Sequence, residues 1–141
     1  MRYRVVAVGR VRDAALRAAC DEYRERLRRY THVEEREVKE EARVLGAVPK
    51  DTRLIALSRT GQQWTSEQLA ERTGRWELEG GDVAFAIGGA DGLPDGTLQA
   101  ADAVWSLSRL TFPHELARVL VYEQLYRAYT IRRGEPYHRG R

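Results

Sequence analysis

The chain has 141 residues, of which 43% are hydrophobic, so it is long and apolar enough to form one folded domain with a core. Cys20 is its single cysteine, which excludes an intramolecular disulfide and a cysteine-rich zinc site. The formal net charge is only +3, but all except two of the 24 basic residues are arginines, which suit phosphate. No apolar run reaches membrane length, and the N-terminal apolar stretch is too short for a signal peptide, so we expect a cytoplasmic location.

The first third of the chain predicts two strands separated by a helix. Residues 3–8 form an apolar run that is typical of a strand. Asp13 is a suitable N-cap for a helix that continues to about Tyr30, because apolar residues recur there at helical spacing. Residues 32–38 predict a short polar edge strand, and residues 39–51 are compatible with either a loop or a short helix.

The middle of the chain predicts a strand followed by a well-capped helix. Residues 54–57 form a short apolar strand, and a polar loop follows it through Gly61. Thr65 and Gln68 have the spacing of a capping box, so a helix is expected from there to about Leu78.

The last part of the chain predicts two more strands and two more helices. A strand is expected at residues 82–87, a helix from about residue 96 to residue 103, and a short strand at residues 104–107. A long helix follows, with Pro113 in its first turn. Because strands alternate with helices, we predict an α/β fold whose mostly parallel sheet is flanked by helices, in a single domain spanning residues 1–141.

The long C-terminal helix is apolar on almost all sides. Between residues 116 and 131, its apolar positions leave no broad polar face. A helix of this kind must be covered on more than one side. In so small a domain a second copy of the chain is the simplest cover, so we predict a homodimer.

Three loops that follow predicted strands are the candidate binding segments: residues 57–59, 88–92 and 107–112. Ligands of parallel α/β sheets gather at the carboxyl ends of the strands. Gly88 and Gly89 come directly after an apolar strand, a pattern that lets a ligand approach bare backbone. The sequence has no phosphate-loop, dinucleotide or nucleophile-elbow motif, and its three histidines lack the spacing of a metal site, so we expect no metal.

The C-terminal tail is strongly basic. Residues 127–141 contain five arginines and one histidine against a single acid, Glu135. Charge alone is compatible with a solvated terminus or with an edge that contacts phosphates.

Four segments carry a family resemblance: VAVG (residues 6–9), IGGADGL (87–93), WSLSRLTFPHELARVLVYEQLYRAY (105–129) and GEPYHRGR (134–141). They resemble the ribosomal RNA large subunit methyltransferase H family over essentially the whole chain. The resemblance implies a SPOUT-class α/β-knot methyltransferase with a C-terminal trefoil knot, acting as a homodimer. It also implies S-adenosylmethionine as cofactor and N3 of a pseudouridine in a 23S rRNA stem-loop of the assembled ribosome as the methylated atom. Residues 39–53 look shorter than the corresponding stretch of that family.

The resemblance also implies site residues. The implied cofactor contacts are Leu57, Gly88, Leu107, Ser108, Arg109, Leu110, Thr111 and Phe112. The PYHR ending is implied to lie near the cofactor, which makes Tyr137 a candidate to stack on a base and His138 a candidate base for the N3 proton. The candidate phosphate contacts are Arg127, Arg132, Arg133 and Arg139. Alternatively, an arginine stabilises the N3 anion while water takes the proton.

Two other functions stay open at this point. A non-catalytic RNA-binding or ribosome-assembly protein with the same fold would bind RNA without the cofactor. A nucleotide-binding enzyme of another α/β type would need a phosphate site, for which the sequence has no motif.

Overall fold

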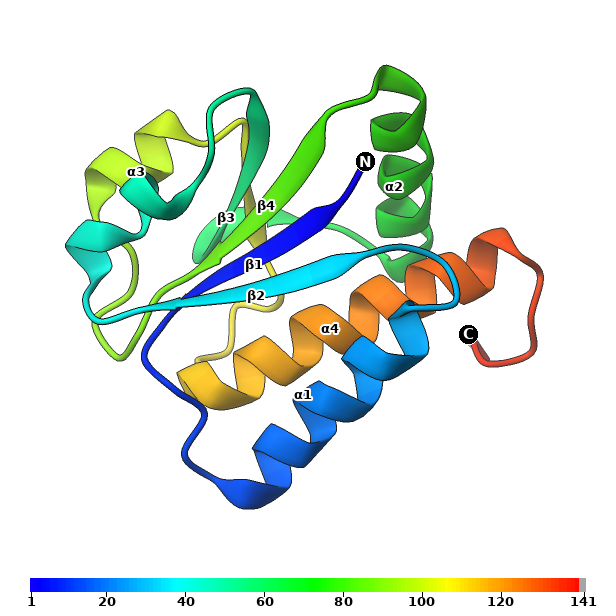
Figure 1. Cartoon of the computed structure of the whole chain (residues 1–141), viewed down its shortest axis with the longest axis horizontal. Coiled ribbons are helices and arrows are strands. Elements are labelled where there is room, and N and C mark those ends of the chain that lie inside the picture. Colours follow the sequence, from blue (N-terminus) through cyan, green and yellow to red (C-terminus); the bar gives the residue numbers. More distant parts are fainter. Residues whose placement is uncertain (140–141) are drawn as a thin grey trace.

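The computed structural model describes residues 1–139, in which five strands form one parallel sheet (Figure 1). The strands are β1 (Tyr3–Val8), β2 (Val33–Val38), β3 (Thr52–Gln63), β4 (Asp82–Ile87) and β5 (Ala103–Ser106), in the spatial order β2-β1-β4-β3-β5. The helices are α1 (Ala14–Leu27), α2 (Ser66–Glu79), α3 (Asp95–Ala100) and α4 (His114–Arg132), with two short 3₁₀ helices, η1 (Glu41–Arg43) and η2 (Leu45–Ala47). The predicted α/β class with a parallel sheet is confirmed.

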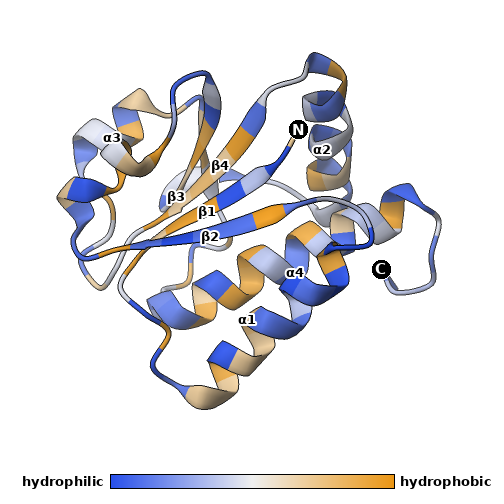
Figure 2. Ribbon diagram, in the orientation of Figure 1, coloured by the Kyte–Doolittle hydropathy of each residue, from blue (hydrophilic) through white to orange (hydrophobic). Residues whose placement is uncertain are grey.

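The sheet is covered on both faces. Val5 and Ala7 of β1 pack into a core with α1, α2 and α4, whereas Val6 and Val8 pack on the other face against Val44 and residues around η2 and α3. This alternation follows from the two-residue period of a strand. Figure 2 shows a second contrast, between central and edge strands, since β1 and β4 carry hydrophobic residues while the edge strand β2 is largely hydrophilic.

The elements with strong local signals lie where the sequence predicts them. β1 and β4 have the predicted bounds. The side chain of Asp13 accepts a hydrogen bond from the Leu16 N–H at 3.0 Å and caps α1. Thr65 and Gln68 form the complete capping box of α2, because each side chain accepts a hydrogen bond from the other residue's backbone N–H.

β3 is longer than predicted. The polar loop expected after Leu57 is instead an outward bulge within the strand, because both Leu57 and Gln62 are in register with Trp105 of β5. Gly61 makes this return possible, since a Cβ at that position would lie only 2.5 Å from the carbonyl oxygen of Val104. Residues 58–61 therefore leave the sheet and come back to the same partner strand.

The other boundaries differ from the predictions by a few residues. α1 ends at Leu27, because the next residues up to Tyr30 form tight turns with hydrogen bonds to carbonyls three residues back. Residues 39–51 contain the two 3₁₀ helices, whereas α3 ends and β5 starts slightly earlier than expected. Pro113 is the N-cap of α4 rather than a residue of its first turn.

Helix α4 finds much of its cover within its own chain. It packs against α1 and α2 as well as the sheet, and Val121, Leu125 and Ala128 are at most 1% exposed. Contacts within the same chain therefore cover part of the apolar surface of α4, and a partner subunit is not needed for that part. The homodimer and the trefoil knot stay predictions. In the described part of the chain, no helix has the length and apolarity needed to cross a membrane.

A buried arginine joins α4 to the sheet. Arg118 is 1% exposed, forms an ion pair with Glu37 of β2 and donates to the Gly9 carbonyl oxygen at 2.8 Å. Glu35 of β2 also lies 3.6 Å from the Arg118 guanidinium. Burial by itself raises the pKa of Glu35, but hydrogen bonds from Arg17 and Tyr122 and nearby positive charges outweigh burial and lower its pKa below the ordinary value. The Glu35 carboxylate therefore stays charged at neutral pH and helps to hold the guanidinium.

We expect the substitution Arg118→Met to lower the free energy of unfolding by about 3 kcal/mol, because it removes the buried cation that joins the part-buried Glu35, Glu37 and the Gly9 carbonyl oxygen. Urea denaturation followed by circular dichroism measures the change. Arg28→Met is the control, since its ion pair with Glu25 is exposed, and it should change stability by no more than about 0.5 kcal/mol. Equal unfolding midpoints for the two variants would contradict the structural role of Arg118.

Candidate functional site

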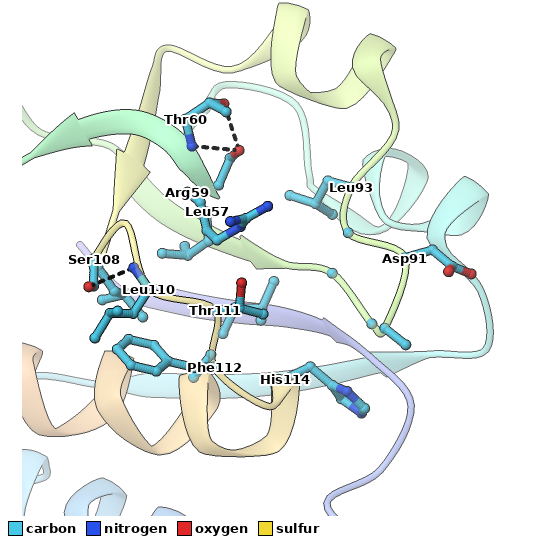
Figure 3. A pocket seen from close by; sticks show the side chains of 18 of the residues that line it. Leu57, Arg59, Thr60, Asp91, Leu93, Ser108, Leu110, Thr111, Phe112 and His114 are labelled. Carbon is cyan, nitrogen blue, oxygen red and sulfur yellow. Dashed lines mark hydrogen bonds between the residues drawn. The ribbon is translucent and has the colours of Figure 1, made fainter.

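A cavity of about 400 Å³ lies at the carboxyl ends of β3, β4 and β5 (Figure 3). The predicted loops after these strands all contribute to its lining, with further residues from α3 and the first turn of α4. Its size is within the range that small-molecule sites occupy. The lining residues are Leu57, Ser58, Arg59, Thr60, Ile87, Gly88, Gly89, Ala90, Asp91, Gly92, Leu93, Leu98, Leu107, Ser108, Leu110, Thr111, Phe112, His114 and Ala117.

All the candidate cofactor residues line this cavity except Arg109. The side-chain oxygen of Ser108 accepts a hydrogen bond from the Leu110 N–H at 3.0 Å, and the Ser106 hydroxyl donates to the Ser108 carbonyl oxygen at 3.0 Å. These bonds close a tight turn with Arg109 at its tip, and its side chain is exposed. The turn therefore brings its neighbours Ser108 and Leu110 to the cavity and leaves Arg109 outside the lining.

The glycines of the 88–92 turn serve the turn itself. A Cβ on Gly88 would lie 2.5 Å from the backbone of Gly92, and the Gly92 N–H donates to the Gly89 carbonyl oxygen at 3.1 Å. Gly92 also has a φ of +75°, a conformation that other residues rarely adopt. The missing side chains of these glycines, which were expected to give a ligand access to the backbone, are therefore also needed for the turn to fold.

The cavity combines apolar walls with two unpaired charges. Leu57, Leu107 and Phe112 provide apolar surface, and Leu110 lies at the mouth with 69% of its area exposed. Within residues 1–139, neither Arg59 nor Asp91 makes an ion pair, and Figure 3 shows them projecting from different walls. Such a site suits a largely apolar ligand that also carries both signs of charge.

Arg59, Asp91 and His114 are lining residues that the sequence analysis did not assign to the site. Arg59 and Asp91 lie in the predicted binding segments 57–59 and 88–92, so their positions in the sequence could have identified them as lining residues. His114 is the first residue of α4, so its place in the lining depends on where the helix begins. No group of histidine, cysteine, aspartate and glutamate side chains among the described residues has the arrangement to hold a metal ion.

The predicted tail residues lie at the opposite end of α4 from the cavity. His114 lines the cavity at the start of this 19-residue helix, which is about 27 Å long at the usual rise per residue. The tail follows Arg132, at the far end of the helix (Figure 1). The structure therefore does not bring the tail and the cavity of one chain together.

The tail residues instead form a network with helices α2 and α4. The Tyr137 hydroxyl donates to Glu123 at 2.7 Å, and Glu123 also pairs with Arg127 at 2.6 Å. Arg127 lies 3.1 Å from Nδ1 of His138, while Nε2 of His138 lies 3.2 Å from Glu67. Because a guanidinium only donates, Nδ1 must accept, and the ring proton belongs on Nε2, where it points to the carboxylate. In this arrangement the lone pair of His138 is already engaged.

The candidate RNA arginines fall into two groups. Arg127 and Arg132 are paired with carboxylates, at 2.6 Å to Glu123 and 2.8 Å to Glu77. In the part of the chain that the structure covers, Arg133 and Arg139 have no carboxylate within ion-pair distance. Arg141, which the basic tail includes, lies outside the described residues. Among the described residues, no nearby carboxylate therefore offsets the charge of Arg133 and Arg139.

The family model described as "Predicted SPOUT methyltransferase" matches residues 1–138. A protein of Sorangium cellulosum named ribosomal RNA large subunit methyltransferase H is 51% identical over 143 residues, covering 97% of this chain and 99% of the relative. The chain belongs to the ribosomal RNA large subunit methyltransferase H family of SPOUT methyltransferases. An Anaeromyxobacter protein of the same name is 46% identical over 154 residues, covering 99% of this SPOUT chain and all of the relative (100%).

Solved structures share the fold of this SPOUT methyltransferase at low sequence identity. A probable methylase family protein from Haemophilus influenzae has a TM-score of 0.61 and 12% identity, over 98% of this chain and 70% of the other. The SpoU methyltransferase AviRb from Streptomyces viridochromogenes, solved in complex with the cofactor AdoMet, has a TM-score of 0.51 and 12% identity. That match covers 94% of this chain and 58% of AviRb.

We expect Gly88→Ala to lower the stability of this methyltransferase by about 2 kcal/mol, because the added methyl group forces the 88–92 turn apart. Gly96→Ala is the matched control, since a Cβ there meets nothing within 4 Å and Gly96 lies in α3. It should be neutral or stabilising by up to about 1 kcal/mol. Thermal unfolding of both variants measures the difference, and a Gly88→Ala protein as stable as the control would rule out the tight turn.

Proposed function

We propose that the chain transfers a methyl group from S-adenosylmethionine to N3 of a pseudouridine in a stem-loop of 23S rRNA on the assembled ribosome. The observation that carries this proposal is the meeting of the three strand-end loops around one cavity, in a chain whose relatives are named ribosomal RNA methyltransferases. The AdoMet complex of the structurally similar AviRb supports the same cofactor.

The cavity has the chemistry that this cofactor needs. The apolar side chains of Leu57, Leu107 and Phe112 would enclose the adenine, and backbone groups of residues 107–112 would hydrogen-bond to its edge. The unpaired Arg59 and Asp91 match the carboxylate and the amino group of a zwitterionic amino acid. The bound cofactor supplies a methyl group on a positively charged sulfur, and the residues of the cavity align it with the acceptor.

The acceptor nitrogen must lose its proton before it can take the methyl group. His138 is one candidate base, and the alternative is an arginine that stabilises the anion while water takes the proton. The contacts of the tail support the second route, because the lone pair of His138 is engaged by Arg127. His138 and Tyr137 are then substrate contacts, and Arg133 and Arg139 hold phosphates.

The distance between the cavity and the tail supports a homodimer with shared sites. The tail of one chain starts after Arg132 and folds back onto Glu123 and Arg127, about 13 to 20 Å along α4 from the end that lines the cavity. A tail that contacts the reacting nucleotide would then do so beside the cavity of the second subunit. A two-fold dimer provides two such composite sites.

Calorimetry with S-adenosylmethionine tests the cofactor proposal. The wild-type chain should bind it with a measurable heat and should incorporate labelled methyl groups into ribosomes that lack the modification. The Gly96→Ala variant should behave like the wild type, because that residue does not line the cavity. If the chain bound RNA but no cofactor, the proposed methyltransferase activity would be wrong, and a non-catalytic RNA-binding or ribosome-assembly function would be favoured.

Mixing two inactive variants tests the shared site. Gly88→Ala damages the cavity and Tyr137→Ala damages the tail, so each homodimer should be inactive or nearly so. A mixture that exchanges subunits should recover roughly a quarter of the wild-type activity, because half of the dimers are mixed and each has one intact composite site. No recovery, with exchange verified by differently tagged subunits, would show that the tail does not act on the partner's cavity.

A further inference from the structure

A second hollow, of about 490 Å³, lies between the end of β3 and the outer face of α2. Gln62, Gln63 and Trp64 line it on the strand side, and Gln68, Glu71, Arg72 and Arg75 line it on the helix side. Gln68, Arg72 and Arg75 have the spacing of one helix face. None of these residues belongs to the cavity or the tail described above.

The hollow contains two positive charges without a counter-ion. Within residues 1–139, neither Arg72 nor Arg75 has a carboxylate within ion-pair distance, whereas Arg132, which reaches the same helix, pairs with Glu77. Glu71 is the one acidic residue of the lining and pairs with neither. Burial of the guanidinium and the charge of Arg75 lower the pKa of Arg72 below its ordinary value. An anion placed between the two arginines would relieve their repulsion.

The hollow also offers a flat surface. The guanidinium of Arg72 lies 4.0 Å from the centre of the Trp64 ring, and that ring stacks on Trp105 at 5.1 Å with an angle of 13° between planes. The Arg72 guanidinium and the Trp105 ring thus both lie against Trp64. Aromatic rings and guanidinium planes are the surfaces on which unpaired nucleobases stack. The side chains of Gln62 and Gln63 are exposed in the same hollow and can hydrogen-bond to base edges.

The hollow and the cavity are built on the same two strands, β3 and β5. Residues 57–60 of β3 line the cavity, and the next residues of that strand, Gln62 and Gln63, line the hollow. On β5, Trp105 lies behind Trp64, and Leu107 lines the cavity two residues later. The two sites therefore follow one another along the same pair of strands.

We propose that this hollow, built from Trp64, Arg72, Arg75, Gln62 and Gln63, binds an unpaired RNA nucleotide that flanks the methylated one. Its base stacks on the guanidinium of Arg72, and its phosphate pairs with Arg75. The inference rests on the proposed function, since the flanking nucleotide is defined by the one in the cavity. An acidic peptide would satisfy the charges but would leave the stacked plane and the amide groups unused.

The double variant Arg72→Gln/Arg75→Gln tests the proposal in the full-length protein. We expect its KM for ribosomes to rise about tenfold, because one stacked base and one phosphate contact are lost, while kcat and the affinity for S-adenosylmethionine stay unchanged. The control is Arg43→Gln/Arg53→Gln, which removes the same charge from arginines that pair with Glu40 and Glu79. An equal rise of KM in both double variants would mean that any loss of positive charge weakens ribosome binding, and it would contradict the proposed nucleotide site.

A binding measurement separates this proposal from the methyltransferase itself. An unpaired oligoribonucleotide should quench the fluorescence of Trp64 in the wild type, and the slope of log affinity against log salt should be lower by about 1 in the Arg72/Arg75 double variant. These readouts need no methyl transfer, so they hold even if the wild type fails to bind S-adenosylmethionine. Unchanged quenching and an unchanged salt slope in the double variant would overturn the proposal, as would equally strong binding of polyglutamate.

Discussion

The buried guanidinium of Arg118 joins the parts of the molecule on which the site depends. It links α4 to Glu35 and Glu37 of the edge strand and to the carbonyl oxygen of Gly9 at the end of β1. One turn before it, α4 begins at His114 and forms part of the cavity. The link costs desolvation, and within residues 1–139 the buried Nε of Arg118 has no hydrogen-bond partner. Because the guanidinium bonds to the ends of two strands, it constrains how α4 sits against the sheet.

The cavity is a product of the parallel sheet and of three departures from regular structure next to it. Residues 58–61 bulge out of β3, the 88–92 turn folds tightly on its own backbone, and the Ser108 turn orients the segment that precedes α4. The bulge lies within β3, the two turns follow β4 and β5, and the parallel arrangement brings all three to one cavity. The site thus needs segments that are far apart in the chain, held by a sheet that buries both of its faces.

The distribution of charge matters more than its sum. A net charge of +3 suggests only a weak attraction to RNA, and many arginines are neutralised by glutamates close to them in space. Among the described arginines that lack such a partner, Arg59 lines the cavity and Arg72 and Arg75 line the hollow. An RNA surface that runs from the hollow to the cavity would therefore keep its positive charge available, while the paired arginines stabilise the fold.

The sequence by itself determined the strands β1 and β4, the caps at Asp13 and Thr65, and the three loops of the cavity, because apolar period, capping and strand ends depend on neighbouring residues. Only the tertiary structure decided that residues 58–61 return to β5, that α1 and α2 cover much of α4, and that the tail lies far from the cavity. It also decided which arginines meet a carboxylate, as at Arg127 and Glu123. Such pairings follow from distances across the fold, and spacing along the chain does not encode them.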